Sequence, residues 1–395
     1  MTTAVQFFET LAAATPSALR KLHNLPGSAV FIDESHASLP AKLWVQAWEW
    51  IKIYSKYWGC HFVLASGSLI RFWKIEEFDK EKTEIPEILP EDFRQEISRR
   101  EIQRVAFKFK KEKMNEYELC DWLITLPGPR LLIVNTVQSA AVIAKKLKSI
   151  YGQKAVEHIS TALVPRDREK ILRKIKSRLK LKDDSDWTLV ATSCVEAGVD
   201  FSFRSGIREA ASLVSLLQTA GRVRRNNESD YYDAAVWTIE LKYDGLLKPH
   251  PTFTDSAKVL LKLAETEEIS PLLCTKALLM ELKESLSFRE KISKAERILD
   301  FETVEEEFKV INSDTVSVLI DEELAKKIKN YEDVSWKDIQ NASVQIWSKK
   351  INKLSLEEIR KGFYYWSYDY DGELIGYMDG LLEIEEFSKE GFVIL

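Results

Sequence analysis

The feature that most constrains the fold is a regular alternation of short apolar stretches with amphipathic ones between residues 101 and 245. Continuous apolar strands separated by helices are typical of a parallel sheet that helices cover on both faces. The strand-like stretches are 104–109, 130–137, 155–161, 187–193 and 233–241, and the helical ones are 116–126, 138–152, 167–181 and 212–226. We therefore predict a doubly wound α/β domain over residues 101–245.

A shorter strand–helix–strand pattern precedes it. The segments "AVFI" (29–32) and "CHFVLASGS" (60–68) indicate two buried strands, and residues 39–59 indicate the helix between them. Residues 74–100 are charged and contain two prolines, which favours a linker. From about residue 250 long amphipathic helices follow, and the chain ends near the aromatic stretch "GFYYWSYDYDGELIGYM". We predict a partial domain over 1–75, a linker over 76–100, and a mainly helical accessory domain over 246–395.

Composition excludes several classes of protein. A formal net charge of −5 gives no overall basic surface, so any nucleic-acid binding must come from a local groove. The four cysteines are scattered without a C-x-x-C pair, which indicates reduced thiols and neither a disulfide framework nor a zinc site. No secretory signal and no apolar run of membrane-spanning length occurs. We expect a soluble, cytoplasmic protein that is not in a membrane.

The stretch "AVFIDESHASLP" (29–40) places Asp33 and Glu34 directly after a strand, with His36 two residues further on. Ligands bind at the carboxyl ends of strands in open α/β sheets. In nucleotide hydrolysis one acid holds Mg²⁺ through water, and its neighbour can orient or deprotonate the attacking water. The alternative is a solvated loop that caps the next helix.

A second pattern, "LLQTAGRVRR" (216–225), fits Q-x-x-G-R-x-x-R through Gln218, Gly221, Arg222 and Arg225. Two arginines three residues apart lie on one face of a helix and can clamp a γ-phosphate. The alternative is a basic helix C-terminus that the helix dipole favours.

Polar residues follow three more strands. The segment "LVATSCVEAGVDFSF" (189–203) carries Thr192 and Ser193 and then Glu196, Gly198 and Asp200; hydroxyls and backbone N–H groups there suit a nucleic-acid phosphate. "LASGSL" supplies Ser66, Gly67 and Ser68, and "IVNTVQSA" supplies Asn135, Thr136 and Ser139. Either of the last two segments, taken alone, is more typical of a helix cap.

The order of these segments resembles that of superfamily 2 helicases, whose two RecA-like domains bind ATP between them and single-stranded nucleic acid across their tops. More finely, the chain is similar to the CRISPR-associated helicase–nuclease of type I systems, which the Cascade complex recruits to reel in and degrade DNA. "TTAVQFFETL", "SALRKLHNLPGSAVFIDESHASLP", "TSCVEAGVDFSF", "LLQTAGRVRRN" and "FYYWSYDYDGELIGYMDGLLEIEEF" carry this resemblance. It implies a RecA-like P-loop NTPase (helicase) fold, with one partial and one complete RecA-like domain and a mainly helical C-terminal domain.

The resemblance also implies roles for residues. Asp33 and Glu34 match the Walker B acids, with Asp33 holding Mg²⁺ through water and His36 beside them. Ser66 and Ser68 match the coupling motif, and Arg222 and Arg225 the arginine fingers. Glu196, Gly198, Asp200, Gln218 and Gly221 fall at the ATP cleft or couple to it, and Asn135, Thr136, Thr192 and Ser193 face DNA. ATP and Mg²⁺ are the implied cofactors.

Two expected parts of such an enzyme are missing from the sequence. None of the fourteen glycines is followed by lysine, so no G-x-x-x-x-G-K-[ST] phosphate loop occurs. The five histidines are dispersed, and none precedes an aspartate as in the family's HD nuclease. We expect the first RecA-like domain to begin just before its Walker B strand, and either a separate chain supplies the phosphate loop and nuclease or the gene is a remnant. The isolated chain is expected not to hydrolyse ATP.

Two further segments leave alternatives open. The basic stretch 167–182 can follow a DNA backbone or form a solvated amphipathic helix buried through Ile171, Leu172, Ile175 and Leu179, which we favour. The aromatic run from Phe363 to Tyr370 can stack on bases or pack on the core, and packing is favoured.

We expect the C-terminal helicase part of a type I CRISPR helicase–nuclease, with single-stranded DNA and Cascade as partners. The alternatives are a non-motor module that binds Cascade or DNA and another superfamily 2 helicase that acts on RNA.

Overall fold

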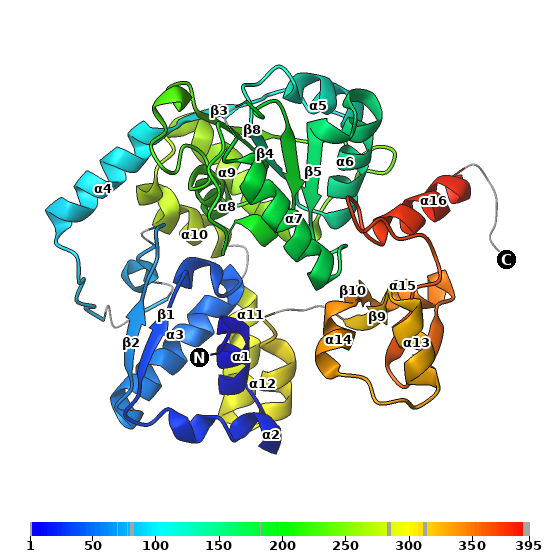
Figure 1. The fold of residues 1–395 in the computed structure, drawn as a ribbon. Coiled ribbons are helices and arrows are strands. Elements are labelled where there is room, and N and C mark those ends of the chain that lie inside the picture. The colour runs from blue at the N-terminus through cyan, green and yellow to red at the C-terminus, as the bar shows by residue number, and fades with distance from the viewer. Residues whose placement is uncertain are drawn as a thin grey trace. The chain divides into compact units, whose positions relative to one another are not determined.

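The computed structural model describes residues 2–68, 70–76, 78–79, 83–181, 183–196, 198–282, 286–310 and 314–389. It divides into two compact units, and each unit combines two separate stretches of chain (Figure 1). Unit 1 is residues 1–102 with 258–312, and unit 2 is residues 103–257 with 313–395. The segment expected to form an accessory domain, 246–395, is therefore divided between the two units.

Unit 1 contains a two-stranded parallel sheet, β1 (Ala29–Ile32) and β2 (His61–Leu64). Its helices are α1 (Ala4–Leu11), α2 (Pro16–Leu19), α3 (Ala41–Trp58), α10 (Cys274–Leu282), α11 (Leu286–Arg297) and α12 (Phe301–Glu307). Helix α3 is the centre of this unit because its buried tryptophans meet residues from both stretches of chain. For example, Trp50 stacks against Phe308, and its indole Nε1 donates to Glu296 at 2.6 Å.

The prediction of two buried strands in unit 1 was wrong. Only Ile32 of β1 is fully buried, Phe31 is 65% exposed, and β2 has no fully buried residue. The reason is that helices of unit 1 cover one side of this small sheet, whereas alternate side chains of a strand point to opposite sides.

The predicted linker is also partly structured. Helix α4 (Glu91–Arg104) occupies its second half, and Arg71 and Arg94 pair with Glu87 near its start. Residues 77 and 80–82 of the predicted linker lie outside the described residues. Helix α9 (Thr254–Thr266), like α4, crosses the boundary between the two units in sequence.

Unit 2 is built on a six-stranded parallel sheet with the order β3-β8-β7-β4-β6-β5. Its strands are β3 (Ala106–Phe109), β4 (Arg130–Ile133), β5 (Val156–Ile159), β6 (Thr188–Ala191), β7 (Ser205–Glu209) and β8 (Ala235–Ile239). Helices α5 (Glu116–Leu123) and α6 (Val137–Tyr151) cover one face, and α7 (Pro165–Arg178) and α8 (Leu213–Ala220) cover the other (Figure 1). The doubly wound α/β domain predicted from the alternating pattern is confirmed.

The sequence pattern missed strand β7, which lies between β8 and β4. Its segment, "SGIRE", has a single large apolar residue and ends in two charges, so it does not resemble a buried strand. Yet every residue of β7 is buried. Gly206 lies where an added Cβ would come 2.6 Å from a Val223 methyl group, and Arg208 and Glu209 are paired internally.

The predicted helix over 212–226 is shorter in the structure. Helix α8 ends at Ala220, and its C-cap is Gly221. Their spacing predicted that Arg222 and Arg225 share one face of a helix. This prediction was wrong, because both residues lie beyond the end of α8. The chain after α8 turns back along the 201–203 segment, where Arg224 N donates to Phe203 O.

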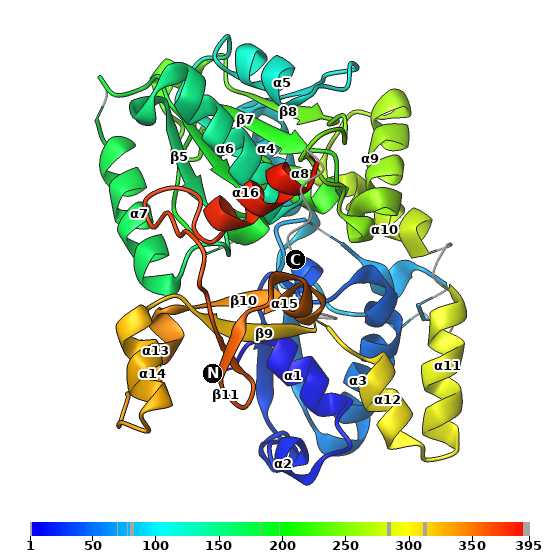
Figure 2. The ribbon, with the colours of Figure 1, turned by 90° about the vertical axis from the view of Figure 1, so that its right-hand side faces the viewer.

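The C-terminal part of unit 2 contains a four-stranded sheet that the sequence analysis did not predict. The strands are β9 (Thr315–Leu319), β10 (Ser343–Trp347), β11 (Glu357–Arg360) and β12 (Phe363–Tyr365), in the order β10-β9-β12-β11. The helices beside it are α13 (Glu322–Lys329), α14 (Trp336–Asn341) and α15 (Ser348–Leu354), whereas α16 (Met378–Lys389) lies against α6 (Figure 2). One apolar cluster contains residues of β4, α6, α16 and the C-terminal sheet, so both sheets of unit 2 contribute to the same core.

Candidate functional site

The acid pair lies in a tight turn at the carboxyl end of β1. Asp33 and Glu34 are both exposed, and Asp33 Oδ1 accepts a hydrogen bond from Glu34 N at 3.0 Å. Glu34 has φ of 46°, in the left-handed region that non-glycine residues occupy at a cost of about 1–2 kcal/mol. The turn that exposes the two carboxylates to solvent is therefore slightly destabilising.

His36 connects this turn to the Ser-Gly-Ser segment after β2. Its Nδ1 lies 2.8 Å from Ser66 Oγ and 3.5 Å from Glu34 Oε2, and Ser66 Oγ lies 2.9 Å from Ser68 Oγ. Burial lowers the pKa of His36 to about 4, against the opposing effect of Asp33, so the imidazole is neutral at pH 7. The structure thus brings together the five predicted site residues of unit 1 in one connected group.

The acid pair suits Mg²⁺ by its chemistry. The described residues contain no group of three or more His, Cys, Asp or Glu that could hold a metal. Mg²⁺ in nucleotide sites needs only one or two carboxylates, because water and phosphate oxygens complete its octahedron. Asp33 and Glu34 supply that number with their oxygens open to solvent.

In unit 2 both predicted arginines hold the loop that follows β6. The Arg222 Nη2 donates to Glu196 O at 2.7 Å, and Arg225 Nε lies 3.0 Å from Asp200 Oδ1. Arg222 is buried, whereas Arg225 and Asp200 are exposed. The two separate motifs of the sequence are thus one structural element.

A buried network that the sequence analysis missed lies under this loop. Arg208 donates from Nε to Glu196 Oε1 at 2.9 Å and from Nη1 to Asn135 Oδ1 at 2.6 Å. Glu209 accepts from Asn135 N at 2.6 Å and from the Tyr243 hydroxyl at 2.6 Å. The network joins the carboxyl ends of β4 and β7 to the loop after β6.

Burial raises the pKa of Glu196 and of Glu209. Arg208 and Arg222 oppose the rise at Glu196 because they stabilise its charged form, and hydrogen bonds from Tyr243 and Asn135 do the same at Glu209. The only sequence signal for this network was the "RE" pair at the end of β7, which lacked the apolar neighbours of a recognisable strand.

The predicted DNA-facing hydroxyls differ in their availability. Thr136 is the N-cap of α6, since its Oγ1 accepts from Ser139 N at 3.0 Å. Thr192 is buried, and its Oγ1 contacts Cys194 Sγ at 3.5 Å. Ser193 is exposed. Of these three residues, Ser193 is the most exposed.

The other cleft candidates lie around the same loop. Gly198 is exposed with φ of 75°, so it turns the chain where a side chain would be strained. Gln218 is half-buried on α8, and Gly221 N donates to Leu217 O at 2.9 Å. Their contributions to a nucleotide site stay predictions.

In the two segments with open alternatives the favoured packing is observed, and their contact with DNA is untested. Ile171 and Ile175 of α7 are buried, and Leu172 and Leu179 pack against them. Trp366 is buried in the main core, and the Tyr370 hydroxyl donates to Asp167 Oδ2 at 3.0 Å. Lys182 of the basic stretch lies outside the described residues.

Residues 128–228 match the family model described as CRISPR-associated nuclease/helicase Cas3, C-terminal. This range contains the network of Arg208, the loop after β6 and both arginines. The chain carries a Cas3-like helicase C-terminal region. A curated CRISPR-associated nuclease/helicase Cas3 from Methanothermobacter thermautotrophicus is 28% identical over 101 residues, which are 26% of this chain and 12% of that protein.

Solved structures show a similar fold over most of the chain. Cas3 of T. fusca with AMPPNP has a TM-score of 0.56 at 14% identity, covering 91% of this chain and 53% of that one. A chain of a CRISPR RNA-guided surveillance complex in the pre-nicking state has a TM-score of 0.55 at 13% identity, covering 90% and 56%. The chain thus spans about half the length of these relatives and shares the RecA-like α/β fold of Cas3. No helix among the described residues is long and apolar enough to cross a membrane.

Proposed function

We propose that this chain is the helicase C-terminal part of a type I CRISPR interference helicase–nuclease, which uses ATP and Mg²⁺ to move along single-stranded DNA. The observation that carries the proposal is the linkage of the loop after β6 to Arg222, Arg225 and Arg208. A motor needs a change at its nucleotide to reach its DNA contacts, and a chain of packed, hydrogen-bonded groups supplies such coupling. The family match covers this same region.

The residues of unit 2 divide into two sets of proposed roles. Arg222 and Arg225 would contact the γ-phosphate, as arginine fingers do. Glu196, Gly198, Asp200, Gln218 and Gly221 would line or couple to the nucleotide. Asn135, Thr136, Thr192 and Ser193 would contact or position the DNA strand, with Asn135 acting through its bond to Arg208.

In unit 1, Asp33 would hold Mg²⁺ through water, and Glu34 would orient the attacking water. His36 contacts both Glu34 and Ser66, so a movement of Glu34 during hydrolysis would shift His36 and, through it, Ser66 and Ser68. As a neutral imidazole it exchanges hydrogen bonds there without adding a charge.

The proposed partners follow from the similar proteins. One structural neighbour is part of a CRISPR RNA-guided surveillance complex, so we propose that this chain docks on a Cascade-type complex. A segment with the phosphate loop and HD nuclease, in a separate chain or elsewhere in the gene, would complete the enzyme. Its place of action would be the cytoplasm.

The purified 395-residue polypeptide provides the test. It should bind a fluorescent oligo-dT strand more tightly than the matching RNA strand, and its affinity should not change with ATP. It should show no DNA-stimulated ATP hydrolysis, since its sequence contains no G-x-x-x-x-G-K-[ST] phosphate loop. Binding of a Cascade–target complex, measured by gel shift, should accompany DNA binding.

Three results would contradict the proposal. Absence of single-stranded DNA binding would remove the motor role, and preference for RNA would favour a different helicase, because discrimination at the 2′-OH identifies an RNA enzyme. Robust DNA-stimulated hydrolysis that Glu34→Gln abolishes would show that these residues hold ATP without the phosphate loop.

A further inference from the structure

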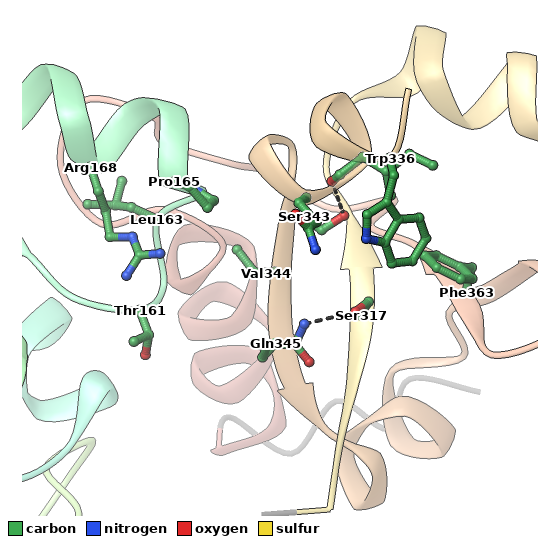
Figure 3. A pocket seen from close by; sticks show the side chains of 12 residues that line it. Thr161, Leu163, Pro165, Arg168, Ser317, Trp336, Ser343, Val344, Gln345 and Phe363 are labelled. Atoms are coloured by element: carbon green, nitrogen blue, oxygen red, sulfur yellow. Dashed lines mark hydrogen bonds between the residues drawn. The ribbon is translucent and has the colours of Figure 1, made fainter. Parts of the chain in front are cut away.

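A pocket of about 320 Å³ lies within unit 2, between the start of α7 and the C-terminal sheet. Figure 3 shows Arg168 and Thr161 on one side, Trp336 and Phe363 on the other, and strand β10 between them. The sequence analysis assigned no role to this combination, because its two walls are about 150 to 200 residues apart in the chain.

Arg168 differs from its nearest basic neighbours on α7. Its neighbours Arg166 and Lys170 pair with Asp321 and Asp167, each at 2.9 Å. In the described part of the chain Arg168 has no ion pair, and its buried Nε has no hydrogen-bond partner. A half-buried guanidinium without an anion is costly, and its planar set of donors suits a phosphate.

The opposite wall offers aromatic surface. The Trp336 side chain is 59% exposed and meets Phe363 edge to face, with ring centroids 5.7 Å apart. An exposed indole beside a neighbouring ring offers a surface on which a nucleic-acid base can stack.

The wall that carries Arg168 is held rigidly by the C-terminal segment. The Tyr370 hydroxyl accepts from Val164 N at 3.0 Å and donates to Asp167 Oδ2 at 3.0 Å. Gly376 lies so close to the same loop that an added Cβ would be 2.1 Å from Ala162 O. A preformed pocket loses little entropy when it binds a ligand.

We propose that this pocket binds one nucleotide unit of single-stranded DNA, with Arg168 on a phosphate and Trp336 against the base. The inference rests on the proposed function, since that function supplies the strand. Strand β10 and its neighbours thereby form a second contact for the DNA, separate from the loops at the ends of β4 and β6. A free nucleotide has the same chemistry, so the test includes it.

The experiment measures fluorescence anisotropy with the full chain and three variants, Trp336→Ala, Arg168→Met and the matched control Arg166→Met. The probes are labelled oligo-dT and a labelled abasic strand of the same length, with dTMP as a competitor. Trp336→Ala should weaken oligo-dT binding by roughly 5- to 100-fold and leave abasic binding unchanged. Arg168→Met should weaken both and reduce the slope of log affinity against log salt by about 0.7, and Arg166→Met should do neither.

The outcomes separate the two proposals. If the wild-type chain binds oligo-dT and both Trp336→Ala and Arg168→Met bind it equally well, the pocket assignment is overturned and the proposed function stands. Saturation of the pocket by dTMP at concentrations that leave oligo-dT binding intact also overturns it. If the wild-type chain binds no oligo-dT, the proposed function is overturned, and the pocket assignment that rests on it is overturned as well.

Discussion

The two units treat their polar candidate residues in opposite ways. In unit 1, Asp33 and Glu34 are exposed directly after strand β1, in which Phe31 is also exposed. In unit 2, Arg208 and Glu209 of the strand β7 and Glu196 of the loop after β6 are buried. Arg208 donates to Glu196, and Glu209 accepts hydrogen bonds from Asn135 and Tyr243. The difference teaches that Arg208, Glu196 and Glu209 support the fold as well as any function, whereas the Asp33 and Glu34 side chains are not part of the packed core.

The sharpest way to break this comparison is Arg208→Met. It removes the partner of the buried Glu196 carboxylate and of Asn135, and an uncompensated buried charge costs about 3–5 kcal/mol. Urea denaturation should show a loss of that size in the free energy of unfolding. The double variant Arg208→Met with Glu196→Gln should recover part of it, and a loss under about 1 kcal/mol for the single variant would mean the network is not structural.

A matched pair of apolar truncations tests the difference between the two sheets. Leu131→Ala in β4 should destabilise by about 2–5 kcal/mol, because the side chain is wholly buried. Phe31→Ala in β1 should change stability by no more than about 0.5 kcal/mol, because its ring is mostly exposed. Equal losses in thermal or urea denaturation would show that the exposed side of β1 is covered in solution.

Acid should weaken unit 2 through His158. Burial lowers the pKa of this histidine from 6.5 to about 4, its Nδ1 contacts Leu374 O at 2.6 Å, and Asp371 opposes the shift. Because the folded state binds the proton less readily, the contribution to stability is complete above pH 6.5 and is lost as the pH falls toward 4.

Between pH 7 and pH 5 this loss should be about 2 kcal/mol in the free energy of unfolding. The variant His158→Gln cannot titrate, so its stability should fall less over the same interval. Identical pH dependence of the two proteins would rule out His158 as the cause.

Among the arginines of unit 2, the smaller effect is expected at Arg225. Its ion pair with Asp200 is solvent-exposed, so Arg225→Met should change the free energy of unfolding by under about 1 kcal/mol. A larger loss would mean that Arg225, like Arg208, belongs to the structural network. Comparison of the two arginine variants by the same denaturation assay therefore marks where that network ends.

The sequence by itself determined the parallel α/β domain of unit 2. Four of the predicted helical stretches and five of the predicted strands correspond to α5 to α8 and to all six strands except β7. Apolar periodicity is a local property, so it is readable without the fold. The order of the polar motifs at strand ends was equally readable, and the family match over residues 128–228 supports it.

Only the tertiary structure decided which residues lie in each unit and which charges are buried. The helices α10 to α12 belong with α3 because Gln46 and Trp50 donate to Glu296, about 250 residues away. Strand β7 can be buried although it contains Arg208, because this side chain donates hydrogen bonds to Glu196 and Asn135. In both cases a charged side chain bonds a residue distant in sequence, Glu296 to Gln46 and Trp50, and Arg208 to Asn135. The apolar periodicity of the sequence is local, so it cannot indicate such a partner.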